Sequence, residues 1–196
     1  MKHPSDLIDE LFKAHLKPAL KEFGFKSKSS TFFRQNGELV EIISLQKSQS
    51  NDANESRFAI NLGVYWPKVQ EIVGGTCETP PPKEYDCTLR QRLGPLFDDG
   101  RDYWWSIKPN SDIQAIGVDV AEKVQRFGLP WFVRAASLDE AVKMAQPRQA
   151  IVFYFLKGEH VQAAALVEEQ IVKNKHAKPL FQLLATKLGL KISAKL

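Results

Sequence analysis

Hydrophobic and polar residues alternate through RFAINLGVYW, residues 57–66, as a strand with one buried face requires. One face of this predicted strand is entirely apolar, with Phe58, Ile60, Leu62 and Val64. The other face carries Asn61 and Gly63, two residue types that strands disfavour. A glycine in this polar row indicates that something approaches the strand closely, or that the strand is bulged there.

The same alternation predicts an antiparallel sheet of about five strands. Asn36-Gly37 is a strong hairpin signal between the first two of them. No helical pattern separates the strands, so consecutive strands are expected to pair as a meander. Residues 67–85, with Gly74-Gly75 and three consecutive prolines, are expected to form a long loop. The other predicted strands lie within residues 30–48, which hold two, 86–94 and 102–107.

An amphipathic stripe with a period of 3.6 residues predicts an N-terminal helix over residues 7–23. Ser5 is its expected N-cap, and Gly24 is its expected end. Pro18 interrupts the pattern, because a proline inside a helix removes a hydrogen bond and clashes with the preceding turn. We therefore expect either a kink near Lys17 or a new short helix with Pro18 in its first turn.

The second half of the chain is predicted to be mostly helical. Ser111 and Gln114 form a capping box for a helix that should stop at Gly128, before Pro130. Residues 150–158, AIVFYFLKG, fit either a buried strand or the start of a helix. Further helices are predicted over residues 137–145, 159–174 and 178–189, the last two as a hairpin.

These elements predict an α+β fold. An N-terminal helix packs on an antiparallel sheet of about five strands, followed by helices and a C-terminal helical hairpin. We expect two parts, an α+β core domain over residues 1–135 and a helical C-terminal extension over residues 136–196.

Composition is ordinary for a globular protein, with 43% hydrophobic and 26% charged residues among 196. The net charge of +4 is below the strong basic excess of an obligate nucleic-acid-binding protein. The first residues lack the apolar core of a secretion signal, and no apolar run reaches the roughly 20 residues of a membrane span. A cytoplasmic protein is the simplest expectation. Cys77 and Cys87 are then expected to be free thiols, with a disulfide across their loop as the alternative.

No sequence motif for catalysis stands out, so we expect no catalytic residue, no metal and no cofactor. None of the four histidines lies in a motif that pairs a nucleophile with a base. His15 falls on the apolar stripe of the first helix, where a packed boundary histidine is the simpler interpretation. The nearest approach to a ligand cluster is Cys77, Glu78, Asp86 and Cys87, which lacks the paired close spacing of zinc sites.

Aligning the apolar rows of the predicted strands brings several polar and aromatic residues to one sheet face. Arginine and tryptophan are the residues that binding hot spots favour, so this face is a candidate partner-binding surface. Two simpler interpretations remain: the face is solvated, as antiparallel sheets allow, or a helix covers it. The candidate residues are Gln46, Ser48, Asn61, Tyr65, Arg90, Arg92 and Trp104.

Basic residues are concentrated near the N-terminus. They form either a solvated helix face or a contact surface for phosphates or an acidic protein. If they bind nucleic acid, the residues involved are Lys13, Lys17, Lys21, Lys26, Lys28 and Arg34.

Five stretches of the chain resemble, in order, one known family. They are LKPALKEFGFKSKSSTFFR (16–34), ISLQKSQS (43–50), FAINLGVYW (58–66), CTLRQRLG (87–94) and DYWWSI (102–107). The resemblance, over about residues 7–130, is to the bacterial domain-of-unknown-function family 4304 (DUF4304). It implies a small, stand-alone bacterial protein of unsettled activity, and it transfers no catalytic residues.

The leading hypothesis is a non-catalytic protein-interaction module with a toxin-neutralising or regulatory role. It would hold another protein on its polar sheet face or its proline-rich loop. The alternative is a nucleic-acid-binding module that uses the lysines of residues 13–28 for phosphates and Tyr65 or a tryptophan for base stacking. The third is an enzyme that recognises an anionic substrate through Arg90, Arg92 and Asn61.

Overall fold

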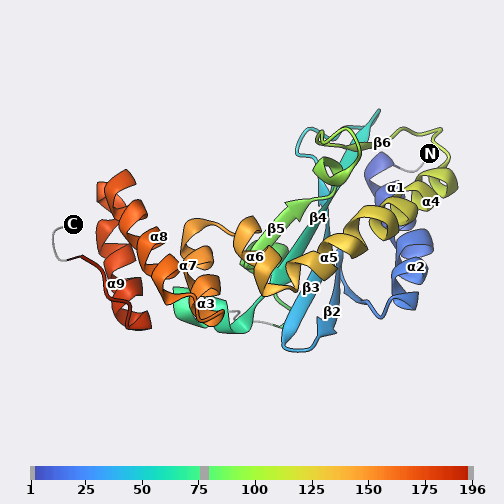
Figure 1. Cartoon of the computed structure of the whole chain (residues 1–196). Helices are drawn as coiled ribbons and strands as arrows, with labels where there is room; N and C mark the ends of the chain where they lie inside the picture. The colour runs from blue at the N-terminus through green and yellow to red at the C-terminus, as the bar shows by residue number, and fades with distance from the viewer. Residues whose placement is uncertain (1–2, 76–79, 194–196) are drawn as a thin grey trace.

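A computed structural model of the chain describes residues 3–75 and 80–193. The predicted α+β fold is confirmed: an antiparallel sheet carries helices on one face, and further helices extend from one end of the sheet (Figure 1). The N-terminus and the C-terminal helices lie at opposite ends of the molecule. The α-helices are α1 (Pro4–Leu11), α2 (Lys17–Glu22), α3 (Pro67–Val73), α4 (Ile113–Lys123), α5 (Leu129–Ala135), α6 (Leu138–Met144), α7 (Pro147–Leu156), α8 (His160–Lys173) and α9 (Lys178–Leu188).

The sheet follows the order β1-β2-β3-β4-β5, and every neighbouring pair is antiparallel. The predicted meander is wrong at its end, because β6 pairs with residues 56–58 of β4, whereas β5 pairs with residues 61–64. Both strands therefore lie along the same edge of β4. The strands are β1 (Lys26–Lys28), β2 (Thr31–Asn36), β3 (Leu39–Lys47), β4 (Ser56–Tyr65), β5 (Leu89–Arg92) and β6 (Trp105–Ile107).

The core lies between one sheet face and the helices α1, α2, α4 and α5. On this core face of the sheet, the alternating apolar side chains of β3 and β4 are almost completely buried. Phe25 packs on Phe132 of α5 with 5.9 Å between ring centroids, and Trp105 of β6 stacks on Phe58 at 5.4 Å. The apolar rows that the sequence displays thus account for the covered face.

Two prolines are accommodated by wide helical turns. Before Pro18 the chain forms a π-helical turn, η1 (Phe12–Leu16), and Lys17 N–H donates to Phe12 O. Before Pro130 a second turn, η4 (Val124–Gly128), is closed in the same way by Leu129 N–H and Val124 O. Because a π-turn bonds residue i to i−5, the carbonyl that a proline ring would strike is displaced.

These turns decide two sequence predictions. Pro18 lies in the first turn of the short helix α2. Of the two alternatives predicted for this proline, the new short helix is therefore confirmed. The predicted end at Gly128 is wrong, since η4 continues directly into α5. The predicted caps are also displaced: His3 rather than Ser5 begins α1, and Asp112 rather than Ser111 begins α4.

Part of the predicted long loop is ordered into helix. Residues 67–73 form α3, and η2 (Glu84–Asp86) is a short 3₁₀ turn. Cys77 lies outside the described residues, so the expectation that its thiol is free, or alternatively bridged to Cys87, stays a prediction. Residues 150–158 fall almost entirely in α7, so the helical alternative is confirmed there.

Helix α3 joins the sheet region to the C-terminal helices. Just before it, Trp66 Nε1 donates to Ala135 O at 3.2 Å, and its ring meets Phe153 of α7 edge-on. At the other end of α3, Arg148 donates to Val73 O at 2.6 Å, and Lys187 donates to two further carbonyls.

The predicted division of the chain into two parts near residue 135 falls at the end of α5 and stays a prediction. Within the described residues, no helix combines the length and the apolar character that a membrane crossing demands.

Candidate functional site

The sheet face opposite the core carries two rows of side chains that run across five strands. Residues opposite each other in an antiparallel sheet point to the same face, so the pairing defines each row. One row begins at Lys28 and the other at Lys26, and both end on an arginine of β5. The full rows are Lys28, Thr31, Ser44, Asn61 and Arg92, and Lys26, Phe33, Ile42, Gly63 and Arg90. This surface is called the polar face below.

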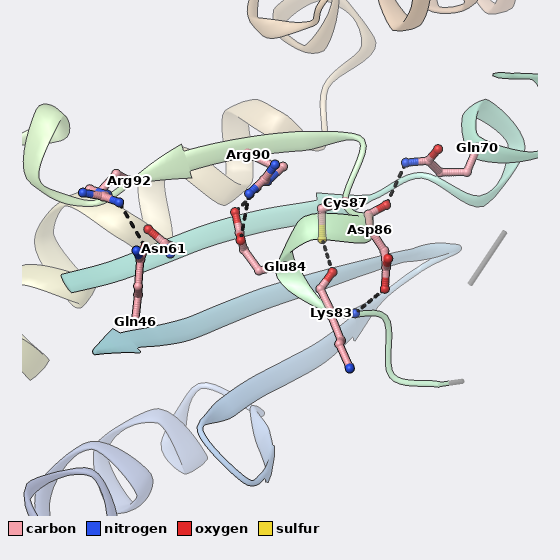
Figure 2. A network of polar contacts seen from close by, with 9 residues as sticks. All are labelled: Gln46, Asn61, Gln70, Lys83, Glu84, Asp86, Cys87, Arg90 and Arg92. Atoms are coloured by element: carbon pink, nitrogen blue, oxygen red, sulfur yellow. Dashed lines mark hydrogen bonds and ion pairs between the residues drawn. The ribbon is translucent and has the colours of Figure 1, made fainter. Parts of the chain in front are cut away.

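Gly63 is required because the chain itself crosses the polar face at this point. A Cβ atom on Gly63 would lie 2.6 Å from Cys87 Sγ and 2.9 Å from Cys87 Cβ. Turn η2 packs here over β3 and β4, and Figure 2 shows it in front of the strands. The glycine that disturbs the strand pattern is therefore explained by an intramolecular contact, and one end of the polar face is covered.

Arg90 fastens this crossing segment to the sheet. Its Nε and Nη2 atoms donate to the two carboxylate oxygens of Glu84 at 2.8 and 3.1 Å (Figure 2). The Glu84 side chain is only 13% exposed, and its bond raises the pKa of the Arg90 guanidinium. On the far side of the segment, Gln70 of α3 donates to Asp86 O at 2.8 Å. Arg90 is thus already engaged by an internal carboxylate partner.

The uncovered end of the polar face carries a connected group of five side chains, called the Arg92 network: Gln46, Asn61, Arg92, Asp102 and Trp104. Gln46 Oε1 accepts from Asn61 Nδ2 at 2.9 Å and from Arg92 Nη2 at 3.0 Å (Figure 2). Arg92 Nη1 donates to Asp102 at 2.8 Å, and Trp104 Nε1 donates to the same carboxylate at 3.0 Å. The Arg92 guanidinium lies 5.0 Å from the centroid of the Trp104 ring.

The Arg92 network is preorganised and still reachable from solvent. The side chains of Arg92 and Asp102 are 29% and 46% exposed. A shared carboxylate fixes both the guanidinium and the indole, so their relative orientation does not depend on a ligand. Sequence reasoning placed four of these residues on one face but missed Asp102, which is the first residue of the predicted strand that holds Trp104.

The remaining candidates of the polar face lie outside this network. Ser48 follows the end of β3, and its hydroxyl accepts from Ser50 N–H in a local turn. Trp105 faces the core, as alternation requires once Trp104 faces outward. Tyr65 lies at the covered end, in the wall of a cleft.

This cleft has a volume of about 570 Å³ and lies between α3, residues 85–90 and the start of α7. It contains Tyr65 and Arg90 from the predicted set, together with Arg148 and Gln149 of α7. No feature of the sequence indicates that α7 lies beside β5. The sequence alone therefore could not predict that Arg148 and Gln149 belong to this cleft. Apart from those already named, the lining residues are Gln70, Val73, Gly74, Gly75, Tyr85, Asp86, Cys87, Thr88, Leu89, Met144 and Gln146.

The predicted basic residues do not form one surface. Lys13, Lys17 and Lys21 are exposed on the N-terminal helices, which cover the core face. Lys26 and Lys28 belong to the polar face, on the opposite side of the sheet. Arg34, the remaining member, pairs with buried Glu41 at 2.5 Å and donates to Phe23 O at 2.7 Å.

The described histidines and acidic residues bring no metal site together. In the described ranges, no three His, Cys, Asp or Glu side chains are arranged to hold a metal ion. His15 packs against Gly117 of α4, where a Cβ would lie 2.5 Å from the imidazole. Its position on the apolar stripe is thus explained by packing.

Comparison with known proteins adds one finding. Residues 16–134 match the family described as Domain of unknown function (DUF4304), and this match covers more than half of the chain. No curated protein and no solved structure matches the chain. The family match includes the whole sheet, α3, α4 and most of α5, and ends before α6. The chain therefore belongs to the DUF4304 family, as its sequence resemblance predicts.

Proposed function

We propose that this protein is a non-catalytic binding protein that holds another protein on the uncovered end of its polar face. The Arg92 network is the centre of the proposed contact. A regulatory or toxin-neutralising role fits such a protein, because both need a shaped surface and neither needs a catalytic group.

The observation that supports this proposal most directly is the fixed pairing of Arg92 with Trp104. Tryptophan and arginine are enriched in binding hot spots, where rigid side chains lose little entropy on association. Here both are carried on or beside strands and oriented by Asp102. Lys26 and Lys28 add positive charge on the same face, which favours a partner with an acidic contact surface.

The nucleic-acid alternative has weaker support. Its six basic residues are divided between the two sides of the sheet, and Arg34 is held by Glu41. An extended phosphate backbone needs several cations along one path. The protein-binding proposal is therefore the better supported of the two.

The test is capture of partners from a lysate of the organism that encodes the chain, with and without nuclease. The tagged protein is compared with its Arg92→Ala and Trp104→Ala variants and with Arg101→Ala. Arg101 is a matched control because it carries the same charge, is 84% exposed and pairs with Asp99, which is outside the Arg92 network. We expect one protein at stoichiometric amount with the wild type and the control, and roughly tenfold less with either variant of the network.

Two results would contradict the proposal. A partner captured equally by all four proteins would bind elsewhere on the chain. Capture that disappears on nuclease treatment and declines steeply with salt would favour the nucleic-acid alternative.

A further inference from the structure

The cleft beside β5 holds an arginine that has no ion pair with any described residue. Arg148 is partly buried at the start of α7, and its Nη2 donates to Val73 O at 2.6 Å. Its Nε atom is buried with no hydrogen-bond partner among the described residues, and so is Oε1 of the adjacent Gln149. Arg148 forms no ion pair with any part of the chain that the structure describes. A charge withdrawn from water without an opposite charge is costly unless something else supplies one.

The other charged groups of the cleft are already engaged. Arg90 is paired with Glu84, and the Asp86 carboxylate accepts from Lys83 N–H at 2.9 Å. Asp86 is the one carboxylate among the described lining residues, and it is not bonded to Arg148. The guanidinium of Arg148 therefore keeps its positive charge without a paired carboxylate among the described residues.

We propose that this cleft binds a small organic anion whose carboxylate or phosphate group pairs with Arg148. The volume of about 570 Å³ is in the range of sites for small molecules. A guanidinium recognises both anions through paired N–H donors, so the shared chemistry is an oxyanion. The glutamines, hydroxyls and Tyr85 of the lining provide donors and acceptors for a polar body such as a sugar or an amino acid.

This site is separate from the proposed protein contact. Gln46, Asn61, Arg92, Asp102 and Trp104 do not line the cleft. Either proposal can therefore fail without the other.

The experiment is a titration of the full-length protein with matched pairs of probes at millimolar concentration. Ribose 5-phosphate is compared with ribose, and glutamate with glutamine, so that each anion has a neutral counterpart. Amide resonances by NMR locate the binding, and calorimetry gives its affinity. We expect at least one anion to shift amides around the cleft while its neutral counterpart does not. The phosphate and carboxylate arms distinguish the two sources of the oxyanion.

Lys187 provides the matched control variant. Like Arg148, it donates to carbonyls at the end of α3, here Glu71 O and Ile72 O, but it does not line the cleft. Both substitutions remove a positive charge and an anchor of α3, but Arg148→Gln does so inside the cleft and Lys187→Gln outside it. We expect Arg148→Gln to weaken binding of the anion roughly tenfold or more, and Lys187→Gln to leave it unchanged.

Three outcomes would overturn the proposal. The first is that no anion shifts the amides of the cleft at millimolar concentration. The second is that Arg148→Gln binds as the wild type does. The third is that Lys187→Gln loses as much affinity, which would assign the effect to the anchoring of α3. If Arg148→Gln does not fold, Arg148→Lys keeps the charge without the paired donors, and it must then bind several-fold more weakly than the wild type for the proposal to stand.

Discussion

Cys87 lies directly over Gly63, so close that a Cβ atom at position 63 would lie 2.6 Å from the cysteine sulfur. This contact seats the segment that closes one end of the polar face. The same contact explains why position 63 is a glycine in a strand that otherwise alternates regularly, because no side chain fits beneath Cys87.

Gly63→Ala is expected to destabilise the fold by about 1–3 kcal/mol, because the added methyl group must displace Cys87 or bend β4. Urea unfolding measures the loss. Gly128→Ala is the control, since a Cβ there would meet its nearest neighbours at an ordinary 3.5–3.7 Å. Equal stability of the two variants would contradict the contact described for Gly63.

Gly117→Ala is expected to push α4 away from the N-terminal helices, because a Cβ would lie 2.5 Å from the imidazole of His15. Overpacking of this kind costs about 1–3 kcal/mol. His15→Gly removes the obstacle, because it takes away both the ring and the Cβ that would lie 2.6 Å from the added methyl group, so the double variant should be more stable than the sum of the single losses predicts. A thermal or urea double-mutant cycle measures this coupling, and strictly additive losses would show that the two residues do not meet.

Arg34→Met is expected to lower stability by about 3–5 kcal/mol, because Glu41, only 1% exposed, would keep a buried charge without its partner. Replacing both residues, as Arg34→Met with Glu41→Leu, should recover most of the loss. Chemical denaturation of the three proteins tests this. If Arg34→Met is as stable as the wild type, Arg34 has no structural role and is again a candidate for the basic contact surface.

Asp139 links α6 to the end of α7, and its hydrogen bond from Lys157 lowers the pKa of its carboxyl group. A lowered pKa in the folded state stabilises the protein above the ordinary carboxyl pKa of 3.8, and this effect is lost as the pH falls through the lower folded value. Asp139→Asn should therefore be less stable than the wild type at neutral pH, with the difference disappearing in acid. Denaturation curves across pH measure it.

Lys157→Met provides the control for this pH dependence. In that background, Asp139→Asn should have little pH-dependent effect, because the group that lowers the pKa is gone. The same salt bridge raises the pKa of Lys157, and that contribution is complete below the ordinary lysine value and lost only in strong alkali. An acid-side difference that persists in the Lys157→Met background would assign it to another group.

The sheet was predictable wherever one face is apolar and the other polar. β3 and β4 show this pattern clearly, and the Asn36-Gly37 signal marks the end of β2, where Gly37 and Glu38 form the turn to β3. β1 was not predicted, because Lys26, Ser27 and Lys28 form a short edge strand with no apolar residue. Edge strands are commonly short and charged, which removes the pattern that would reveal them.

The candidate site was predictable as a face but not as a set of contacts. Alternation alone assigns Gln46, Asn61 and Arg92 to one surface, and the strand pairing then brings them together. The partners that decide what each arginine does come from other segments: Glu84 lies in a turn, and Asp102 precedes β6. Such long-range pairs depend on how loops return to the sheet, which no local period encodes.

The π-helical turns η1 and η4 have a consequence for how the chain can change in length. Each turn holds one residue more than an α-helical turn of the same position would, and each is followed within two residues by a proline. We therefore expect the extra residue of each turn and the proline after it to be gained or lost together. Deleting one residue from η1 together with Pro18→Ala should give an uninterrupted α-helix, whereas the deletion alone leaves Pro18 inside a regular helix, where its ring strikes the preceding turn. Related chains that lack Pro18 or Pro130 are accordingly expected to be one residue shorter in the same helix.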